Sequence, residues 1–223
     1  MRVGILTITL VVPALIVIFL NLFGENKYNL EEIDPVNESQ DLQIYNPKVV
    51  NCQSDSLPHK VPYFSFTSQE NKEVNHTTVD GKIYVANFFF SRCPSTCPSM
   101  MSSLLRVQDF FSDNPEIKIL SHTVDPEYDS TYVLKTYAEK FGAKQDFWHF
   151  LTGAKEDLYE IARCGYFIVA KPSEDQKNDF IHSDKLVLID KDKRIRGYYT
   201  GTDREEVDRL ITEIQVLLKE YNL

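Results

Sequence analysis

A short apolar stretch and the two cysteines that follow it constrain the fold of this chain most. Residues 83–90 read IYVANFFF, and Cys93-Pro94-Ser95-Thr96-Cys97-Pro98 follows almost at once. The stretch is rich in β-branched and aromatic residues, as a strand covered on both faces requires. Pro94 excludes a helix interior, whereas Pro98 suits the first position of a helix. We therefore expect a loop carrying two thiols between a buried strand at 82–90 and a helix at 98–111.

The thiols in this loop are placed for soft chemistry. Cys97 is expected to cap the helix N-terminus, where partial positive charge stabilises a thiolate, and Arg92 adds a full charge nearby. Both effects should lower the thiol pKa. The pair can hold a soft metal or close into a disulfide, and two thiolates alone are a poor site for a transition metal. A third ligand should come from elsewhere in the fold.

The rest of the chain alternates strands with helices and then changes pattern. After a region at 71–81 that reads as a hairpin or turn, the predicted strands are 82–90, 117–124, 147–151, 186–190 and 195–200. The predicted helices are 98–111, 130–141, 154–163 and a last one after the apparent capping box 202–205. This order predicts an α/β fold, a thioredoxin-like mixed sheet flanked by helices. The dithiol then lies at the carboxyl end of a central strand, where open sheets place their sites.

The N-terminus predicts a membrane anchor. Residues 3–23 read VGILTITLVVPALIVIFLNLF, about 20 residues without a charge, which is enough to cross a bilayer as one helix. A cleaved signal peptide is the rival interpretation, but no small-residue cleavage site follows. Arg2 precedes the span, so the positive-inside rule places the domain outside the cytoplasm. Without an Arg-rich transit peptide, this favours a single-pass protein of a bacterial inner membrane, with its domain in the periplasm.

Three segments follow from this pattern: an anchor at 1–23, a flexible tether at 24–60 and a folded domain at 61–223. The tether is polar, acidic and interrupted by Pro35, Pro47 and Pro58, without periodicity. A formal net charge of −9 argues against nucleic acid as a partner. The absence of a Gly-rich phosphate loop argues against a nucleotide cofactor.

Two further cysteines and five histidines remain to be placed. Cys164 reads best as a small buried hydrophobic residue, although a Cys52–Cys164 bridge stays open because sequence cannot fix connectivity. Among the candidates for the third ligand, His182 precedes a predicted strand after a long polar loop, which in this fold faces the first strand–helix junction. The others have plainer positions: His59 is in the tether, His76 in a turn, His122 at a polar strand edge, and His149 in a structural setting.

Four ordered segments resemble the SCO/SenC family of copper-delivery proteins, which act in cytochrome c oxidase assembly. They are the CPxxCP run at 93–98, TVDPE at 123–127, LTG at 151–153, and IHS at 181–183 followed by LVLID at 186–190. The resemblance covers about residues 60–221. It departs at Phe90-Ser91-Arg92, where the family usually has a Gly-Tyr-Thr-like run, and Cys52 and Cys164 are outside its motif.

The resemblance implies that Cys93, Cys97 and His182 bind copper, and two thiolates with one imidazole suit Cu(I). A structural zinc site would normally have four protein ligands. Asp125 can be read as orienting a ligand or partner, or as a strand-end turn residue.

The implied function is a membrane-tethered metallochaperone, not an enzyme. It would receive copper from a donor protein and deliver it to the CuA-bearing subunit of cytochrome c oxidase. The alternative is a thiol–disulfide reductase using Cys93 and Cys97, although the CxxxC spacing differs from the CxxC of thioredoxin-type enzymes. A peroxidase or a scaffold without chemistry fits the paired thiols less well.

Overall fold

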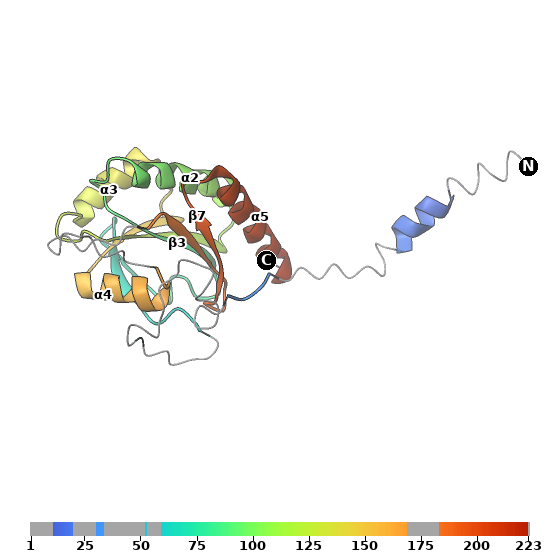
Figure 1. Cartoon of the computed structure of the whole chain (residues 1–223), viewed down its shortest axis with the longest axis horizontal. Coiled ribbons are helices and arrows are strands. Elements are labelled where there is room, and N and C mark those ends of the chain that lie inside the picture. Colours follow the sequence, from blue (N-terminus) through green and yellow to red (C-terminus); the bar gives the residue numbers. More distant parts are fainter. Residues whose placement is uncertain (1–10, 20–29, 34–51, 53–58, 169–182, 223) are drawn as a thin grey trace, which may run out of the picture.

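The structure, a computed structural model, describes residues 11–19, 30–33, 52, 59–168 and 183–222. These residues contain one seven-stranded sheet in the order β2-β1-β5-β4-β3-β6-β7, with helices on both faces (Figure 1). The strands are β1 (Ser65–Ser68), β2 (Glu73–Asn75), β3 (Ile83–Phe89), β4 (Ile117–Thr123), β5 (Trp148–Thr152), β6 (Lys185–Ile189) and β7 (Ile195–Thr200). The helices are α2 (Thr96–Phe111), α3 (Thr131–Lys140), α4 (Lys155–Glu160), the π-helix η1 (Ile161–Gly165) and α5 (Arg204–Glu220).

Strand β3 lies inside the sheet and is buried along its whole length. It pairs in parallel with β4 and antiparallel with β6, and β4 pairs in parallel with β5. The mixed sheet predicted from the sequence is therefore confirmed. Because β3, β4 and β5 run in the same direction, their carboxyl ends meet at one edge, which is where the cysteine loop begins.

Two hydrophobic clusters cover the two faces of the sheet. One packs α2, α3 and α5 against the sheet through residues such as Met100, Leu134 and Leu210. The other packs α4 and η1 against the opposite face through residues such as Leu158 and Ala162. In Figure 1, α2 and α3 accordingly lie on one side of the sheet and α4 on the other. Helices that bury one apolar stripe against each face explain the layered architecture.

Most predicted elements are present, and the differences are local. The hairpin-or-turn region proves to belong to a β1–β2 hairpin, and the third predicted helix ends as the π-helix η1. Helix α5 is capped by Asp203, whose side chain accepts from the N–H of Glu205 at 2.9 Å. The N-cap therefore lies at Asp203, one residue after Thr202, where the expected capping box starts.

The described part of the predicted tether contacts the domain. The guanidinium of Arg196 donates to the carbonyl oxygens of Leu30 and Glu31, and the N–H of Ile33 donates to the carbonyl of Ile195 at 3.0 Å. Arg196 is almost fully buried and also pairs with Asp190 at 2.9 Å. Residues 30–33 therefore dock along β7, beside the end of α5.

The predicted anchor at 1–23 lies mostly outside the described residues. Residues 11–19 are helical, and in the part of the chain that the structure describes no helix is long and apolar enough to span a membrane. The boundaries at 1–23, 24–60 and 61–223 stay predictions.

Candidate dithiol and metal site

Cys93 and Cys97 lie where β3 ends and α2 begins. The N–H of Cys93 donates to the carbonyl of Phe90 at 3.1 Å, which closes a tight turn directly after the strand. Helix α2 starts at Thr96, so Cys97 belongs to its first turn. The N-cap residue Ser95 makes no capping hydrogen bond with its side chain, and the N–H of Cys97 donates to Cys93 Sγ at 3.4 Å. The sulfur of Cys93 therefore takes the role of a capping oxygen.

The pKa values of the two thiols are shifted in opposite directions. Burial raises the pKa of Cys93, but the backbone N–H groups of Cys97, Ser95 and Thr96 outweigh it, so the net pKa is lowered. Burial raises the pKa of Cys97 to about 12, and the Cys93 sulfur adds to this. The prediction of a lowered pKa at Cys97 is wrong, because its side chain is buried and the N–H groups at the start of α2 are directed at Cys93 instead. The helix N-terminus therefore stabilises a thiolate at Cys93, while Cys97 lies in the core.

Arg92 is engaged away from the sulfurs. Its guanidinium pairs with Asp125 at 2.5 Å and lies 4.3 Å from the ring centre of Tyr128. Asp125 is therefore more than a turn residue, because it holds the side chain next to Cys93 in place. The positive charge expected to act on the thiols is shared with this carboxylate.

Asp129 ties the cysteine loop to the end of β4. Its carboxylate accepts from the N–H and the hydroxyl of Ser91 and, at 2.5 Å, from the hydroxyl of Thr123. The side chain is fully buried. The sequence alone did not single out Asp129 as a functional residue. A second aspartate four residues after Asp125, at the carboxyl end of a strand beside the dithiol, was the signal for this role.

The sulfurs provide two of the predicted metal ligands. Both cysteines are free. Two soft sulfur donors suit a soft cation such as Cu(I). The described ranges hold no ready-made group of three or more His, Cys, Asp or Glu for a metal. His182, the predicted third ligand, lies outside the described residues, so the three-ligand set stays a prediction.

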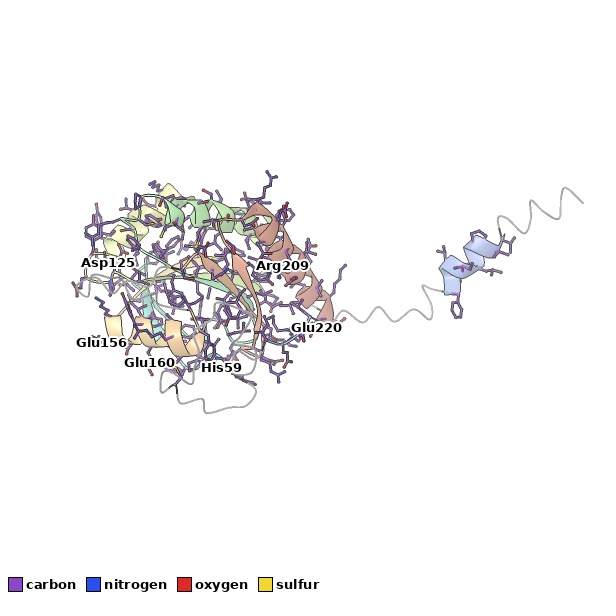
Figure 2. The ribbon with its side chains drawn as sticks, viewed as in Figure 1. His59, Asp125, Glu156, Glu160, Arg209 and Glu220 are labelled. Carbon is purple, nitrogen blue, oxygen red and sulfur yellow. A yellow bond between two sulfur atoms is a disulfide. The ribbon has the colours of Figure 1, made fainter. Side chains whose placement is uncertain are left out.

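The other histidines occupy structural positions. His122 was expected at a polar strand edge, but it is fully buried and its ring stacks on Phe88 at 5.0 Å. That expectation is wrong because the rings of Phe66, Phe88 and Tyr166 surround the imidazole. His59 contacts the carbonyl of Gly165 at 2.9 Å, and in Figure 2 it lies far from Asp125, the residue that pairs with Arg92 beside Cys93. Burial lowers the pKa of His149 to about 4.

Cys52 and Cys164 form a disulfide. The bond joins the segment before the domain to η1, and it resolves the question that the sequence left open. Cys164 is half-buried and covalently paired, so its reading as a small buried hydrophobic residue is wrong. The disulfide leaves Cys93 and Cys97 as the free thiols of the chain.

Residues 53–219 match the family model described as SCO1/SenC, which covers well over half of the chain. This chain belongs to the SCO1/SenC family. The match includes β3 and the dithiol. It also includes the Arg92–Asp125 and Ser91–Asp129 pairs, which hold the cysteine loop in place. It agrees with the four motifs that carried the resemblance.

Relatives within the SCO1/SenC family share the fold over most of their length. A Bacillus subtilis SCO1 protein homolog is 28% identical over 163 residues, which cover 72% of this chain and 84% of the relative. A SCO1/SenC family lipoprotein from Bacillus anthracis superposes with a TM-score of 0.64 at 26% identity, covering 71% of this chain and 94% of the other. The structure of BsSco, a Sco family cytochrome c oxidase assembly protein with a disulfide switch, gives 0.61 at 27% identity, covering 73% and 95%.

Proposed function

We propose that this chain is a copper metallochaperone that holds copper through Cys93, Cys97 and His182. The observation that carries the proposal is a pair of free thiols with unequal pKa at the open end of the sheet, in a chain of the SCO1/SenC family. Cu(I) favours soft ligands and low coordination number, and two sulfurs with one imidazole meet both demands. Family structures from Arabidopsis thaliana and yeast, which contain bound copper, support the choice of metal.

The recipient in this proposal is the copper-binding subunit of cytochrome c oxidase. The description of BsSco as an oxidase assembly protein supports it. Copper would arrive from a donor protein and leave by exchange of one ligand at a time. No bond of a substrate is made or broken, so the chain is not an enzyme in this role.

The proposed location is the periplasmic side of a bacterial inner membrane, with residues 3–23 as a single-pass anchor. The uncharged span and Arg2 before it support this orientation. The Cys52–Cys164 disulfide also supports it, because structural disulfides persist in oxidising compartments and are rare in the cytoplasm.

Copper binding by ligand variants tests the proposal. The reduced full-length chain should bind one Cu(I) in competition with a chromophoric chelator, whereas Cys93→Ser, Cys97→Ser and His182→Ala should each weaken binding at least tenfold. His76→Ala is a matched control, because His76 lies beside Tyr63 and Phe64 in the cavity that Cys52 and Cys164 also line. Affinity of His182→Ala equal to that of the unmodified chain would refute the three-ligand site.

A thiol–disulfide reductase is the second candidate, favoured by the lowered pKa of Cys93 beside a buried Cys97. The Cys93 thiolate would attack a target disulfide and form a mixed disulfide, releasing one target thiolate. Cys97 would then displace the second target thiol and leave a Cys93–Cys97 disulfide, which an external dithiol must reduce again. His182→Ala would spare this activity, whereas it would weaken copper binding.

A further inference from the structure

The segment before the domain is fastened to it by residues 30–33, which we call the strap. The buried guanidinium of Arg196 donates to the carbonyl oxygens of Leu30 and Glu31. The N–H of Leu30 donates to a carboxylate oxygen of Glu220 at 3.3 Å, and in Figure 1 the strap accordingly lies beside the C-terminal end of α5. These hydrogen bonds hold the first half of the strap to the domain.

The second half of the strap is held by polar and apolar contacts together. The N–H of Ile33 donates to the carbonyl of Ile195 at 3.0 Å. Glu32 forms an ion pair with Arg194. Leu30 packs against the hydrophobic cluster on one face of the sheet, and Ile33 packs against the cluster on the other face. Exposed ion pairs contribute little to stability, but apolar burial combined with hydrogen bonds fixes a short segment in one position.

The strap lies at the end of the sheet opposite the dithiol. Ile195 begins β7, directly after the turn that joins β6 to β7. Ile189, the last residue of β6, pairs with Tyr84 near the amino end of β3, whereas Cys93 follows the carboxyl end of β3. The length of β3, seven residues, separates the two ends by about 20 Å. The strap and the cysteine loop therefore mark opposite ends of the domain.

The docked strap shortens the connection between the proposed anchor and the domain. Residues 24–29 connect the span at 3–23 to Leu30, and even a fully extended chain of this length reaches only about 20 Å. Without the strap, the free chain would run from residue 24 to Cys52, which the disulfide holds at η1. A coil of that length has a root-mean-square span of about 30 Å and extends to about 90 Å. The strap therefore replaces a long flexible connection with a short one.

We propose that the strap orients the domain on the membrane, with the β6–β7 turn toward the lipid surface and the dithiol toward the aqueous side. This inference rests on the proposed function, because it takes residues 3–23 as a membrane anchor and concerns the same dithiol. Copper is then exchanged with a partner whose own copper site stands clear of the bilayer. The geometry disfavours a partner site at the level of the lipid headgroups.

Energy transfer to acceptor lipids tests this orientation. The full-length chain, with Cys93→Ser/Cys97→Ser to remove the free thiols, carries one donor dye at either Asp192→Cys or Ser95→Cys. It is inserted into phosphatidylcholine vesicles that contain a fluorescent acceptor lipid. Asp192 is exposed in the β6–β7 turn, and Ser95 is exposed in the cysteine loop. Transfer from the dye at Asp192→Cys should be at least twofold more efficient, and equal transfer from both positions would overturn the inference.

Two variants show whether the strap causes the difference. Insertion of a flexible Gly-Ser segment of about 20 residues after Asn29 keeps every strap contact but lengthens the connection, so the two efficiencies should converge. Leu30→Pro/Ile33→Pro removes both N–H donors and should have the same effect. Asn37→Pro/Gln40→Pro, with the same spacing beyond the strap, is the control and should keep the difference. A difference that persists in either of the first two variants would overturn the inference.

Cu(I) affinity separates this inference from the proposed function. Because the strap lies away from the dithiol, Leu30→Pro/Ile33→Pro with both cysteines intact should bind Cu(I) with the affinity of the unmodified chain. Equal transfer from the two dye positions, with normal Cu(I) affinity, would overturn the orientation alone. Loss of Cu(I) binding in the unmodified chain would overturn the proposed copper site but not the orientation. Failure of the unmodified chain to float with the vesicles would overturn the proposed membrane location and this inference together.

Discussion

Removing the Cys52–Cys164 disulfide should strongly destabilise the domain. The two cysteines are 112 residues apart in sequence, and the loop they close contains β1 to β5 with α2, α3 and α4. A cross-link lowers the entropy of the unfolded chain, and for a loop of this length the effect is about 5 kcal/mol at 25 °C. The Cα atoms are 5.4 Å apart, inside the normal range, so the native backbone accommodates the bond.

The assay is urea unfolding of Cys52→Ser/Cys164→Ser against the unmodified chain, both without reductant. We expect the free energy of unfolding to fall by about 3–5 kcal/mol, because native disulfides usually contribute about 2–5 kcal/mol. With a slope of about 2 kcal/mol per molar urea, the midpoint falls by roughly 2 M. The variant Cys93→Ser/Cys97→Ser is the control, since it removes two thiols and keeps the bond.

A loss below about 1 kcal/mol in Cys52→Ser/Cys164→Ser would contradict this reasoning. It would mean that the N-terminal segment does not constrain the unfolded chain. Copper affinity gives a second check, because the disulfide lies away from the dithiol. Under conditions in which it remains folded, Cys52→Ser/Cys164→Ser should bind Cu(I) with the affinity of the unmodified chain.

Three further outcomes follow from the structure. Burial lowers the pKa of His122 to about 4 from 6.5, so stability should be full above pH 6.5 and fall by up to about 3 kcal/mol toward pH 4; His122→Phe should flatten that slope in urea unfolding at several pH values. Iodoacetamide should modify Cys93 at least ten times faster than Cys97 at pH 8, read by mass spectrometry; equal rates would contradict the assigned roles. Arg196→Met should lower the free energy of unfolding by about 3 kcal/mol, because it leaves the buried carboxylate of Asp190 without its cation. An unchanged melting temperature would contradict a stabilising role for the Arg196–Asp190 ion pair.

The sheet could be predicted because the residue composition of its strands indicates how far each strand is buried. The run at 83–90 had to be covered on both faces, and β3 is buried along its whole length. The start of α2 could not be fixed in the same way. Proline is tolerated throughout the first turn of a helix, where N–H groups have no partner inside the helix, so Pro98 is compatible with a start at Thr96. With this shift of two residues, the capping role expected of Cys97 belongs to Cys93.

Contacts between residues far apart in the chain could not be predicted from the sequence either. A polar segment rich in proline and without periodicity predicts a free tether, yet residues 30–33 dock on the domain through Arg196, and Cys52 is bonded to Cys164. Neither contact has a local pattern, because one depends on a buried guanidinium and the other on which thiols meet in space.

The unequal thiols give the proposed copper transfer a direction. Cys93 is partly exposed, and the N–H groups at the start of α2 favour its thiolate form. In the proposed transfer, a metal-binding side chain of the partner protein therefore reaches the copper at Cys93 first. Cys97 lies in the core, where a thiolate forms only with a metal or another donor to compensate its burial. Copper should therefore exchange at Cys93 while Cys97 still holds it, and its departure should return Cys97 to the protonated state that its buried surroundings favour. A site with two equally exposed thiols would have no such order.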